Sequence, residues 1–279
     1  MKRWIKKNLV TVILTMIMLV GIGLIAYPSV ADWWNSFHQS RAVSSYASVV
    51  ASMDRNEYDD ILKKAEEYNA KLAQKGIQWQ SSDEEVAEYN EVLKVDNTGI
   101  MGYIDIPKIR VQLPIYHGTD ESILQIAIGH LVGTSLPVGG ESSHCIVSGH
   151  RGLPSARLFT DIDQLVPGDT WTLNVLDQTL TYEVDQVRVV LPTDLSYLAL
   201  EEGQDYCTLV TCTPYGVNTH RLLVRGHRIA NVQGNARVTA DALQIEPVYV
   251  APFVAAPMLV ILFIMLLFTT RKGRRNRRE

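Results

Sequence analysis

The stretch YCTLVTCTPYGVNTHRLLVRGHR, from Tyr206 to Arg228, places a thiol among several cationic side chains. Cys212 ends an apolar run, and Arg221 follows nine residues later, after the turn-forming segment TPYGVN, so a hairpin with that loop would bring Arg221 near the thiol. Since the thiolate is the nucleophilic form of cysteine, a neighbouring cation or histidine activates it. Acyl transfer also needs a proton carrier and a group that stabilises the oxyanion. His150, at the end of IVSGH, is the candidate proton carrier, with Cys212 as nucleophile and Arg221 as oxyanion stabiliser.

Spacing alone leaves simpler interpretations open for these residues. A cysteine in an apolar run is often a small buried hydrophobic residue, and a single histidine in a β domain is often a structural hydrogen-bonding group. Among the other histidines, His220 has the best claim to the edge of an active site because it precedes Arg221. We interpret five histidines as structural or rim residues, namely His117, His130, His144, His220 and His227.

The remaining cysteines, Cys145 and Cys207, lie five residues before His150 and Cys212 respectively. If the two runs form neighbouring strands, both cysteines sit at a similar depth. Two buried thiols or one structural disulfide fit this spacing. Three cysteines in all are too few for the disulfide framework of a small secreted fold.

The elements that must position these residues are short β-rich runs separated by Gly, Pro and Asp, which begin after Gly99. This pattern predicts a mostly β domain over residues 99–235, either a sandwich or a closed barrel. That length suffices for one hydrophobic core. Two stretches within it have a helical pattern, DESILQIAIG and PSARLFTDIDQL. Residues 236–247 are predicted to be a polar linker.

Residues 28–98 are predicted to be a helical segment outside the β domain. DRNEYDDILKKAEEYNAKLAQ has apolar residues at helical spacing, with Asp54 as its expected N-cap and Gly76 as its end. A second helix is expected after the capping box of Ser82 and Glu85. The loop between the two helices, residues 76–82, has the sequence GIQWQSS.

Two uncharged apolar runs, residues 8–27 and 248–270, are long enough to cross a bilayer. Basic flanks at 1–7 and 271–279 predict that both termini are cytoplasmic and that the catalytic domain is extracellular. A cleavable signal peptide is the alternative for the first run, because Ser29-Val30-Ala31 resembles a cleavage site. The first flank carries four positive charges and the last a net five. Because the net charge of the whole chain is −4, residues 8–270 carry a net charge of −13. This acidic domain argues against nucleic acid or anionic lipid as the main partner.

The segment TLVTCTPYGVNTHRLLVRGHR resembles the active-site strand and loop of class C sortases, the pilus-assembling transpeptidases of Gram-positive bacteria. GYIDIPKIRVQLPIYHGT, GHLVGTSLPVGG and IVSGHRGLPSARLFTDIDQL agree with the same family, over about residues 99–230. The resemblance implies an eight-stranded sortase-type β-barrel with N-terminal helices, a lid and two transmembrane helices. It also implies that Cys212 is the nucleophile, His150 the acid/base, and Arg221 the residue that stabilises the oxyanion or positions substrate. Arg225 and Arg228 match other cations of the motif.

The reaction implied is cleavage of an LPxTG-like sorting signal between Thr and Gly, through a thioester on the cysteine. The acyl group then passes to an amine, for class C typically a pilin Lys, and no metal or organic cofactor is implied. The partners would be LPxTG-bearing pilins or surface proteins, an amine acceptor (a pilin Lys or cell-wall peptide), and the membrane. A housekeeping-type sortase, which anchors surface proteins to cell-wall peptide, is the alternative.

Other classes of protein fit the sequence less well. An L,D-transpeptidase is disfavoured because no His-Gly pair directly precedes a cysteine, and a papain-like peptidase because the histidine precedes the cysteine in the chain. A surface protein that is itself sorted would carry an LPxTG-like motif just before its final apolar run. DALQIEPVYVAP contains none.

Class C sortases resemble one another in a lid loop with an Asp-Pro-aromatic motif, whose Asp pairs with the catalytic Arg. Here Ile77 and Gln78 occupy the Asp and Pro positions, and Trp79 occupies the aromatic position. Our hypothesis is that Trp79 still plugs the site while the ionic latch to Arg221 is missing. Losing one exposed ion pair costs about 0.2–1 kcal/mol, so the lid should open more easily.

Overall fold

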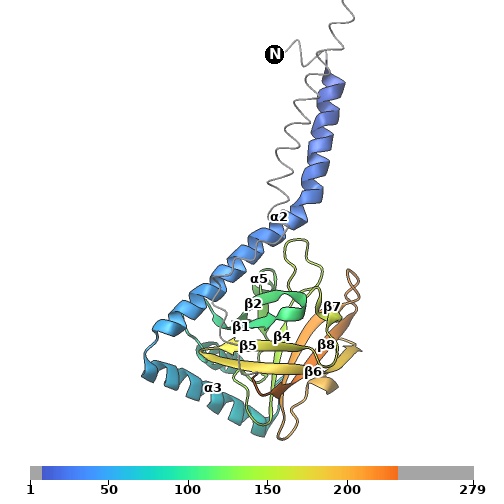
Figure 1. Cartoon of the computed structure of the whole chain (residues 1–279). Helices are drawn as coiled ribbons and strands as arrows, with labels where there is room; N and C mark the ends of the chain where they lie inside the picture. Colours follow the sequence, from blue (N-terminus) through green and yellow to red (C-terminus); the bar gives the residue numbers. More distant parts are fainter. Residues whose placement is uncertain (1–7, 232–279) are drawn as a thin grey trace, which may run out of the picture. The chain divides into compact units, whose positions relative to one another are not determined.

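The computed structural model describes residues 8–231, and Figure 1 shows its N-terminal helices beside a β-barrel. The helices are α2 (Leu9–Ser52), α3 (Arg55–Lys75) and α4 (Asp83–Glu91). Helix α2 runs without interruption across the predicted boundary at residue 28. Among the described residues it is the one helix long and apolar enough to cross a membrane. The second predicted membrane helix (residues 248–270), the linker and both basic tails lie outside the described residues.

The predicted helix caps of the N-terminal segment are confirmed. The Asp54 carboxylate accepts a hydrogen bond from the Asn56 backbone N–H and begins α3, and Gly76, with φ of 81°, ends it. Ser82 and Glu85 form a reciprocal capping box at the start of α4. These caps satisfy N–H groups that have no partner inside a helix, so local sequence fixes where the loop 76–82 begins and ends.

Eight strands close into a barrel in the order β1-β2-β3-β4-β7-β8-β6-β5, which confirms the mostly β, eight-stranded fold. The strands are β1 (Ile100–Ile106), β2 (Val111–His117), β3 (Ile128–His130), β4 (Ser143–Ser148), β5 (Thr170–Val175), β6 (Gln178–Val190), β7 (Asp205–Thr213) and β8 (His220–Ile229). Closure leaves no unpaired edge strand. Strands β4 and β7 are parallel neighbours although 56 residues separate their ends, so the fold brings distant segments together.

The helical segment is attached to the barrel by buried tyrosines. The Tyr46 hydroxyl of α2 donates to the Met101 carbonyl at 3.0 Å and accepts from the Leu176 N–H at 2.8 Å. The Tyr58 hydroxyl of α3 donates to the Asp177 carboxylate in the turn between β5 and β6. Two helices are therefore fixed to the same end of the β5–β6 hairpin.

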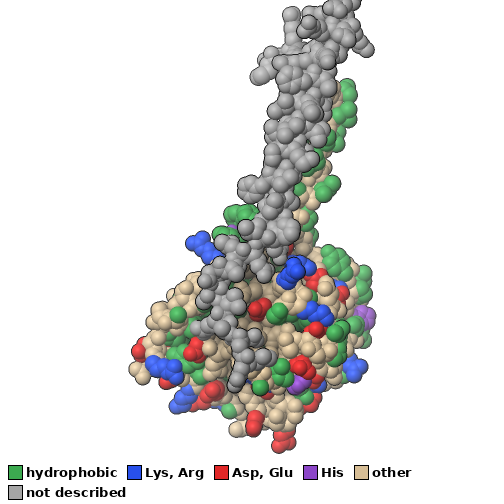
Figure 2. Space-filling view, viewed as in Figure 1, with side chains coloured by type: hydrophobic (Ala, Val, Ile, Leu, Met, Phe, Trp, Pro, Cys, Tyr) green, Lys and Arg blue, Asp and Glu red, His purple; other side chains and the backbone are tan. Residues whose placement is uncertain are grey.

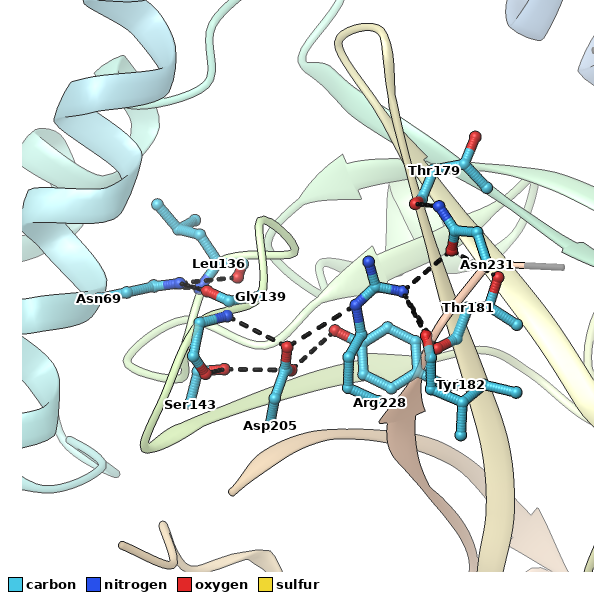
Figure 3. A network of polar contacts seen from close by, with 12 residues as sticks. Asn69, Leu136, Gly139, Ser143, Thr179, Thr181, Tyr182, Asp205, Arg228 and Asn231 are labelled. Carbon is cyan, nitrogen blue, oxygen red and sulfur yellow. Dashed lines mark hydrogen bonds and ion pairs between the residues drawn. The ribbon is translucent and has the colours of Figure 1, made fainter. Parts of the chain in front are cut away.

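A polar network fixes the first residues of β4 and β7, at the end of the barrel opposite Cys212 (Figure 3). Burial raises the pKa of Asp205, the first residue of β7, and its carboxylate is the centre of the network. Its contacts are Gly140 N at 3.1 Å, Ser143 Oγ at 3.2 Å, Tyr182 Oη at 2.9 Å and Arg228 Nε at 3.9 Å. Beside it, Asn69 of α3 bonds both backbone groups of Leu136, in the loop before β4. The two strands thus start from a fixed register.

The two helices predicted inside the β domain are largely wrong. DESILQIAIG splits into a single helical turn, α5 (Glu121–Leu124), and strand β3. PSARLFTDIDQL forms turns and one short 3₁₀ helix, η2 (Ile162–Gln164). The physical reason lies at Leu158 and Phe159, whose consecutive side chains are both buried in the core. A positive φ of 40° at Leu158 turns the backbone out of the helical conformation there.

Two buried histidines should make the stability of the barrel depend on pH. Neutral His130 accepts at Nδ1 from the Tyr89 hydroxyl and donates from Nε2 to the Ser135 carbonyl, at 2.8 Å each. His144 has equivalent partners, and burial lowers the pKa of both histidines to about 4. The unfolded chain takes up these protons near pH 6.5, and the folded chain only near pH 4. The free energy of unfolding should therefore fall as pH drops through this range, by about 3 kcal/mol per histidine.

Urea unfolding between pH 7 and pH 4, followed by tryptophan fluorescence, measures this slope. His130→Gln should have a lower unfolding free energy at pH 7. Its unfolding free energy should change with pH about half as steeply as that of wild type, because only His144 then contributes. An unfolding free energy that stays flat from pH 6.5 to pH 4 would contradict the assignment.

Candidate active site

Cys212 lies one residue before the end of β7, and its Cα pairs with that of Arg221 on β8. A turn joins the two strands, closed by hydrogen bonds from Val217 N and Asn218 N to the Pro214 carbonyl. The thiol is free and half-buried. The prediction that this hairpin brings Arg221 beside Cys212 is confirmed at the level of strand register.

His150 reaches the same level of the barrel from the other side of β7. The parallel register pairs Ser148 with Val210. The next residue continues it: Gly149 N donates to the Val210 carbonyl at 3.1 Å, and the Thr211 hydroxyl donates to the Gly149 carbonyl at 2.7 Å. His150 is two residues beyond Ser148, and Cys212 is two beyond Val210. The three residues predicted from sequence therefore stand on three adjacent strand ends.

Two residues that sequence reasoning missed hold the histidine segment in place. Arg151 donates from Nη1 to the Thr213 hydroxyl at 3.1 Å and pairs through Nη2 with the Asp163 carboxylate. Arg151 directly follows His150 and Thr213 directly follows Cys212, so this bond links the two segments that carry the site. The other is Glu121 of α5, whose carboxylate lies 3.4 Å from His150 Nε2. That contact is at ion-pair distance but lacks hydrogen-bond geometry.

The signals for these two residues were weak in the sequence. Arg151 directly follows His150 in the run GHRG, where it can be read as one more surface cation. Glu121 lies 29 residues before His150 and meets it only after the chain has passed through β3 and β4. Neither distance along the chain nor residue type alone predicts the contact.

Arg221 differs from the two other arginines of β8. Arg225 pairs with carboxylates of Asp185 and Glu201, at 2.8 and 3.0 Å, and covers the Tyr206 ring. Arg228 belongs to the network around Asp205. Arg221 donates from Nη1 only to backbone carbonyls, at 3.1 and 3.4 Å, and has no salt bridge within residues 8–231. A guanidinium without a carboxylate partner, one strand from a thiol, is available to a negatively charged reacting group.

Cys145 and Cys207 are paired in the β4–β7 register, as the prediction of similar depth requires. Both are free and buried in the structure. Burial and the neighbouring Cys207 raise the pKa of the Cys145 thiol. The raised pKa holds Cys145 in the unreactive protonated form, Cys207 is buried beside it, and Cys212 is the described thiol that solvent reaches.

The loop 76–82 contacts the barrel beside the site through a different side chain from the one we expected. Ile77 packs on an apolar cluster of the barrel's outer surface. The members of this cluster are Ile146, Val190, Leu198 and Leu223, flanked by Leu131 and Val210. Gln78 N donates to the Gly133 carbonyl at 2.9 Å, whereas Trp79 remains 40% exposed. The plug role of Trp79 stays a prediction.

This arrangement of thiol, imidazole and guanidinium can carry out acyl transfer. The thiol supplies a nucleophile, the imidazole can give a proton to a leaving amine, and the guanidinium can stabilise an oxyanion. Within residues 8–231 no group of three or more His, Cys, Asp or Glu side chains is arranged to hold a metal ion.

Comparisons with known proteins agree with this chemistry. The family described as the sortase domain matches residues 104–229. Sortase D of Bacillus subtilis is 30% identical over 166 residues, covering 57% of this chain and 81% of that protein. Crystal structures of class C enzymes are more similar. Sortase C1 of Streptococcus agalactiae is 56% identical with a TM-score of 0.68, covering 69% of this chain and 100% of that one. Sortase C of Streptococcus pneumoniae is 43% identical with a TM-score of 0.62, covering 68% and 97%.

The eight-stranded barrel, the thiol at the end of β7 and the similarity to solved enzymes lead to one conclusion. This chain belongs to the sortase family, as a cysteine transpeptidase of class C.

Proposed function

We propose that Cys212, His150 and Arg221 are the catalytic residues, and that they act on an LPxTG-like sorting signal. The observation that carries the proposal is their alignment on adjacent strand ends, with Cys212 between the other two. Supporting it, Arg221 has no carboxylate partner among the described residues, and the other two cysteines are buried.

In the first half of the reaction, the Cys212 thiolate attacks the carbonyl carbon of the Thr-Gly bond. The Arg221 guanidinium stabilises the oxyanion that forms, in the way that fixed donors lower such barriers. Protonated His150 gives its proton to the leaving Gly amine as the C–N bond breaks. The product is a thioester between Cys212 and Thr, with the Gly segment released.

In the second half, an amine attacks the thioester carbonyl and His150 takes up the amine proton. The C–S bond breaks and Cys212 leaves as thiolate, so that a new amide joins Thr to the acceptor. One difficult amide exchange is thereby divided into two easier steps. No oxidant, reductant or cofactor enters this balance.

The substrate class is supported by what relatives are known to act on. Clostridium perfringens sortase C, 40% identical with a TM-score of 0.60, was solved with the C-terminal cell wall sorting motif. The Streptococcus pneumoniae structure bears on pilin substrate specificity. We therefore propose that the acyl donor is a pilin with an LPxTG-like signal and that the acceptor is a Lys of the next pilin, in pilus assembly.

The proposed topology has two membrane passes with the catalytic domain outside the cell. The apolar first half of α2 supplies the first pass. The second pass is residues 248–270, proposed from sequence hydropathy and the basic residues that follow. A cysteine placed in the tail 271–279 should then react with a membrane-impermeant maleimide only after the cells are opened.

Replacing Arg221 by Ala or by Lys should separate the effect of its positive charge from that of its planar guanidinium. Arg221→Ala is expected to lower kcat by about 10²–10³, the usual effect of losing one oxyanion donor. Arg221→Lys should recover little of this, because ammonium cannot reproduce the planar fork of the guanidinium. Initial rates of peptide cleavage measure both, with Arg188→Ala on β6 as a control cation. Full activity of Arg221→Ala would remove Arg221 from the mechanism.

We propose that the loop 76–82 covers the site as a lid that is held mainly by Ile77. Ile77→Ala removes part of a half-buried side chain, about 1 kcal/mol of apolar burial, and should raise the acylation rate about fivefold. Gly133→Ala leaves the sequence of the loop unchanged but should displace it, because a Cβ there would lie 2.0 Å from the Gln78 carbonyl oxygen. It should therefore raise the acylation rate in the same way.

Controls separate lid opening from general loop strain. Gly140→Ala is in the same loop, also at positive φ, but its Cβ would meet nothing within 4 Å, so its acylation rate should be unchanged. Trp79→Ala tests the remaining hypothesis: a rate equal to wild type would exclude Trp79 from gating. Wild-type rates in both Ile77→Ala and Gly133→Ala would show that the loop is no lid.

The acceptor is tested by competition. The enzyme is supplied with a pilin subunit bearing the signal and with two amines, a Lys-containing pilin domain and a cell-wall peptide. Products linked to pilin Lys support the proposal. Products linked only to the cell-wall peptide would point to a housekeeping-type function.

A further inference from the structure

The part of α2 that follows Pro28 has two opposite faces. One face meets the barrel through polar side chains that bond backbone groups near the active site. Those contacts are Asp32 Oδ1 with Arg157 N, Asn35 Nδ2 with the Ser155 carbonyl, and Gln39 Nε2 with the Ile126 carbonyl, each at 2.7 Å. Ser155 and Arg157 belong to the segment that follows His150 in the chain. This face of the helix therefore holds the rim of the active site.

The other face is apolar, aromatic and exposed. Tyr27, Val30, Trp34 and Phe37 recur at intervals of three and four residues, so they share one side of the helix. Their exposed fractions are 54–58%. We call these four residues the aromatic stripe. Arg41, four residues beyond Phe37, is also exposed and ends the stripe with a positive charge.

The stripe continues the membrane-spanning part of the same helix. Residues 9–27 are predominantly apolar, most of the side chains described there are exposed, and the stripe begins at residue 27. In Figure 2 hydrophobic side chains line this part of α2 and reappear where the helix meets the barrel. Tyrosine and tryptophan favour the boundary between lipid tails and water, and a basic residue beside them favours anionic headgroups.

The aromatic stripe is longer than the headgroup layer is thick, so all of it can contact lipid only if α2 bends. Phe37 is ten residues beyond Tyr27, about 15 Å along a helix, whereas the headgroup layer is only about 5–7 Å thick. A helix that continued straight out of the membrane would carry Phe37 into water. Pro28 lies inside α2, and proline kinks a helix. Figure 1 shows α2 changing direction partway along its length.

We propose that residues 28–41 of α2 lie along the outer surface of the membrane, with the aromatic stripe at the level of the lipid headgroups. The barrel is then held on the side of the helix that faces away from the bilayer. The segment 151–161 and the end of α5 are held next to the membrane surface. Resting on the proposed function, this places Cys212 close to substrates that are still anchored in the membrane by the segment after their sorting signal.

The test uses the full chain in vesicles of phosphatidylglycerol and phosphatidylcholine. Phe37→Cys and Val30→Cys, each combined with Cys212→Ala, are labelled with a nitroxide, while the buried Cys145 and Cys207 stay unlabelled. Lys64→Cys on the exposed face of α3 is the matched control. Paramagnetic resonance then compares the access of molecular oxygen, which concentrates in lipid, with that of a water-soluble nickel chelate.

Labels at residues 30 and 37 should favour oxygen over the chelate at least about tenfold more than the label at residue 64. Equal accessibility at residues 37 and 64 would overturn the proposal, because the stripe would lie in water. Low access to both reagents would also overturn it, because protein would then cover the stripe, either a second copy or residues 232–279 of this chain. The readout involves no catalysis, so it is independent of the proposed function.

A second measurement tests the functional consequence. The double variant Trp34→Ser/Phe37→Ser should cleave a soluble sorting peptide at the wild-type rate. Its turnover of the same signal on a membrane-anchored substrate should fall about tenfold, because the active site and the anchored sorting signal are no longer held at the same membrane surface. Equal loss with both substrates would indicate damage to the barrel and contradict an orienting role.

Discussion

Cys212→Ala is expected to abolish cleavage of an LPxTG-like peptide, lowering the rate by a factor on the order of 10³ or more. The reason is that no other described thiol can take its place: Cys145 and Cys207 are buried and face the inside of the barrel. Release of the Gly-containing fragment, separated by chromatography, measures the rate.

The matched control is Cys207→Ala, on the same strand five residues earlier. It removes one buried sulfur and is expected to cost some stability through a small cavity, while the rate of cleavage stays near wild type. A Cys212→Ala enzyme within tenfold of wild type would disprove the proposed nucleophile. Loss of activity in Cys207→Ala without loss of folding would assign a role to the buried pair.

His150→Gln should have the next largest effect, a fall in kcat of about 10²–10⁴, because the leaving amine loses its proton donor. Glutamine keeps hydrogen-bonding capacity and a similar size, so the loss would report proton transfer rather than packing. Both acylation and deacylation by an amine should slow, since the same imidazole serves in both halves of the reaction. Single-turnover measurements separate the two steps.

His227→Gln is a suitable control because His227 lies on β8 but pairs with Tyr206, at the far end of β7 from Cys212. It should leave both steps unchanged. If His150→Gln slowed only one half of the reaction, a second proton carrier would be required. Glu121, which meets His150 at 3.4 Å, would then be the first side chain to test.

Local sequence predicted those parts of the fold that depend on local contacts. The N-cap at Asp54, the C-terminal Gly76 and the Ser82 capping box each involve residues within four positions of one another. Such signals can be read directly from a chain because the bond partners are neighbours in sequence. The turn segment TPYGVN between two strand-like runs likewise predicted a hairpin around Cys212 and Arg221.

The prediction of helix over PSARLFTDIDQL failed because tertiary packing overrode the local pattern. Leu158 and Phe159 are adjacent, and a helix would point them about 100° apart. The barrel instead buries both, together with Ile162 and Leu165, so the backbone forms turns. Burial of several large side chains outweighs a modest local preference for helix.

The three residues proposed as catalytic could be predicted because they lie in dense motifs, whereas the residues that support them were missed. Arg151 acts through a contact made only after β4 is placed beside β7, and Glu121 through one made only after α5 is placed beside His150. The loop 76–82 shows the same limit. The family pattern drew attention to Trp79, but the apolar cluster on the barrel packs against Ile77. The four buried members of that cluster come from four separate segments of the chain.

Intact mass spectrometry of the enzyme with an LPxTG-type peptide tests the central claim most directly. The peptide is added without an acceptor amine, and the adduct is mapped by proteolysis. The mechanism predicts one adduct with the mass of the peptide through its Thr, located on Cys212, absent in Cys212→Ala and increased in Ile77→Ala. An adduct on another residue, or none in either the wild-type enzyme or the Ile77→Ala variant across several LPxTG-like signals, would contradict it.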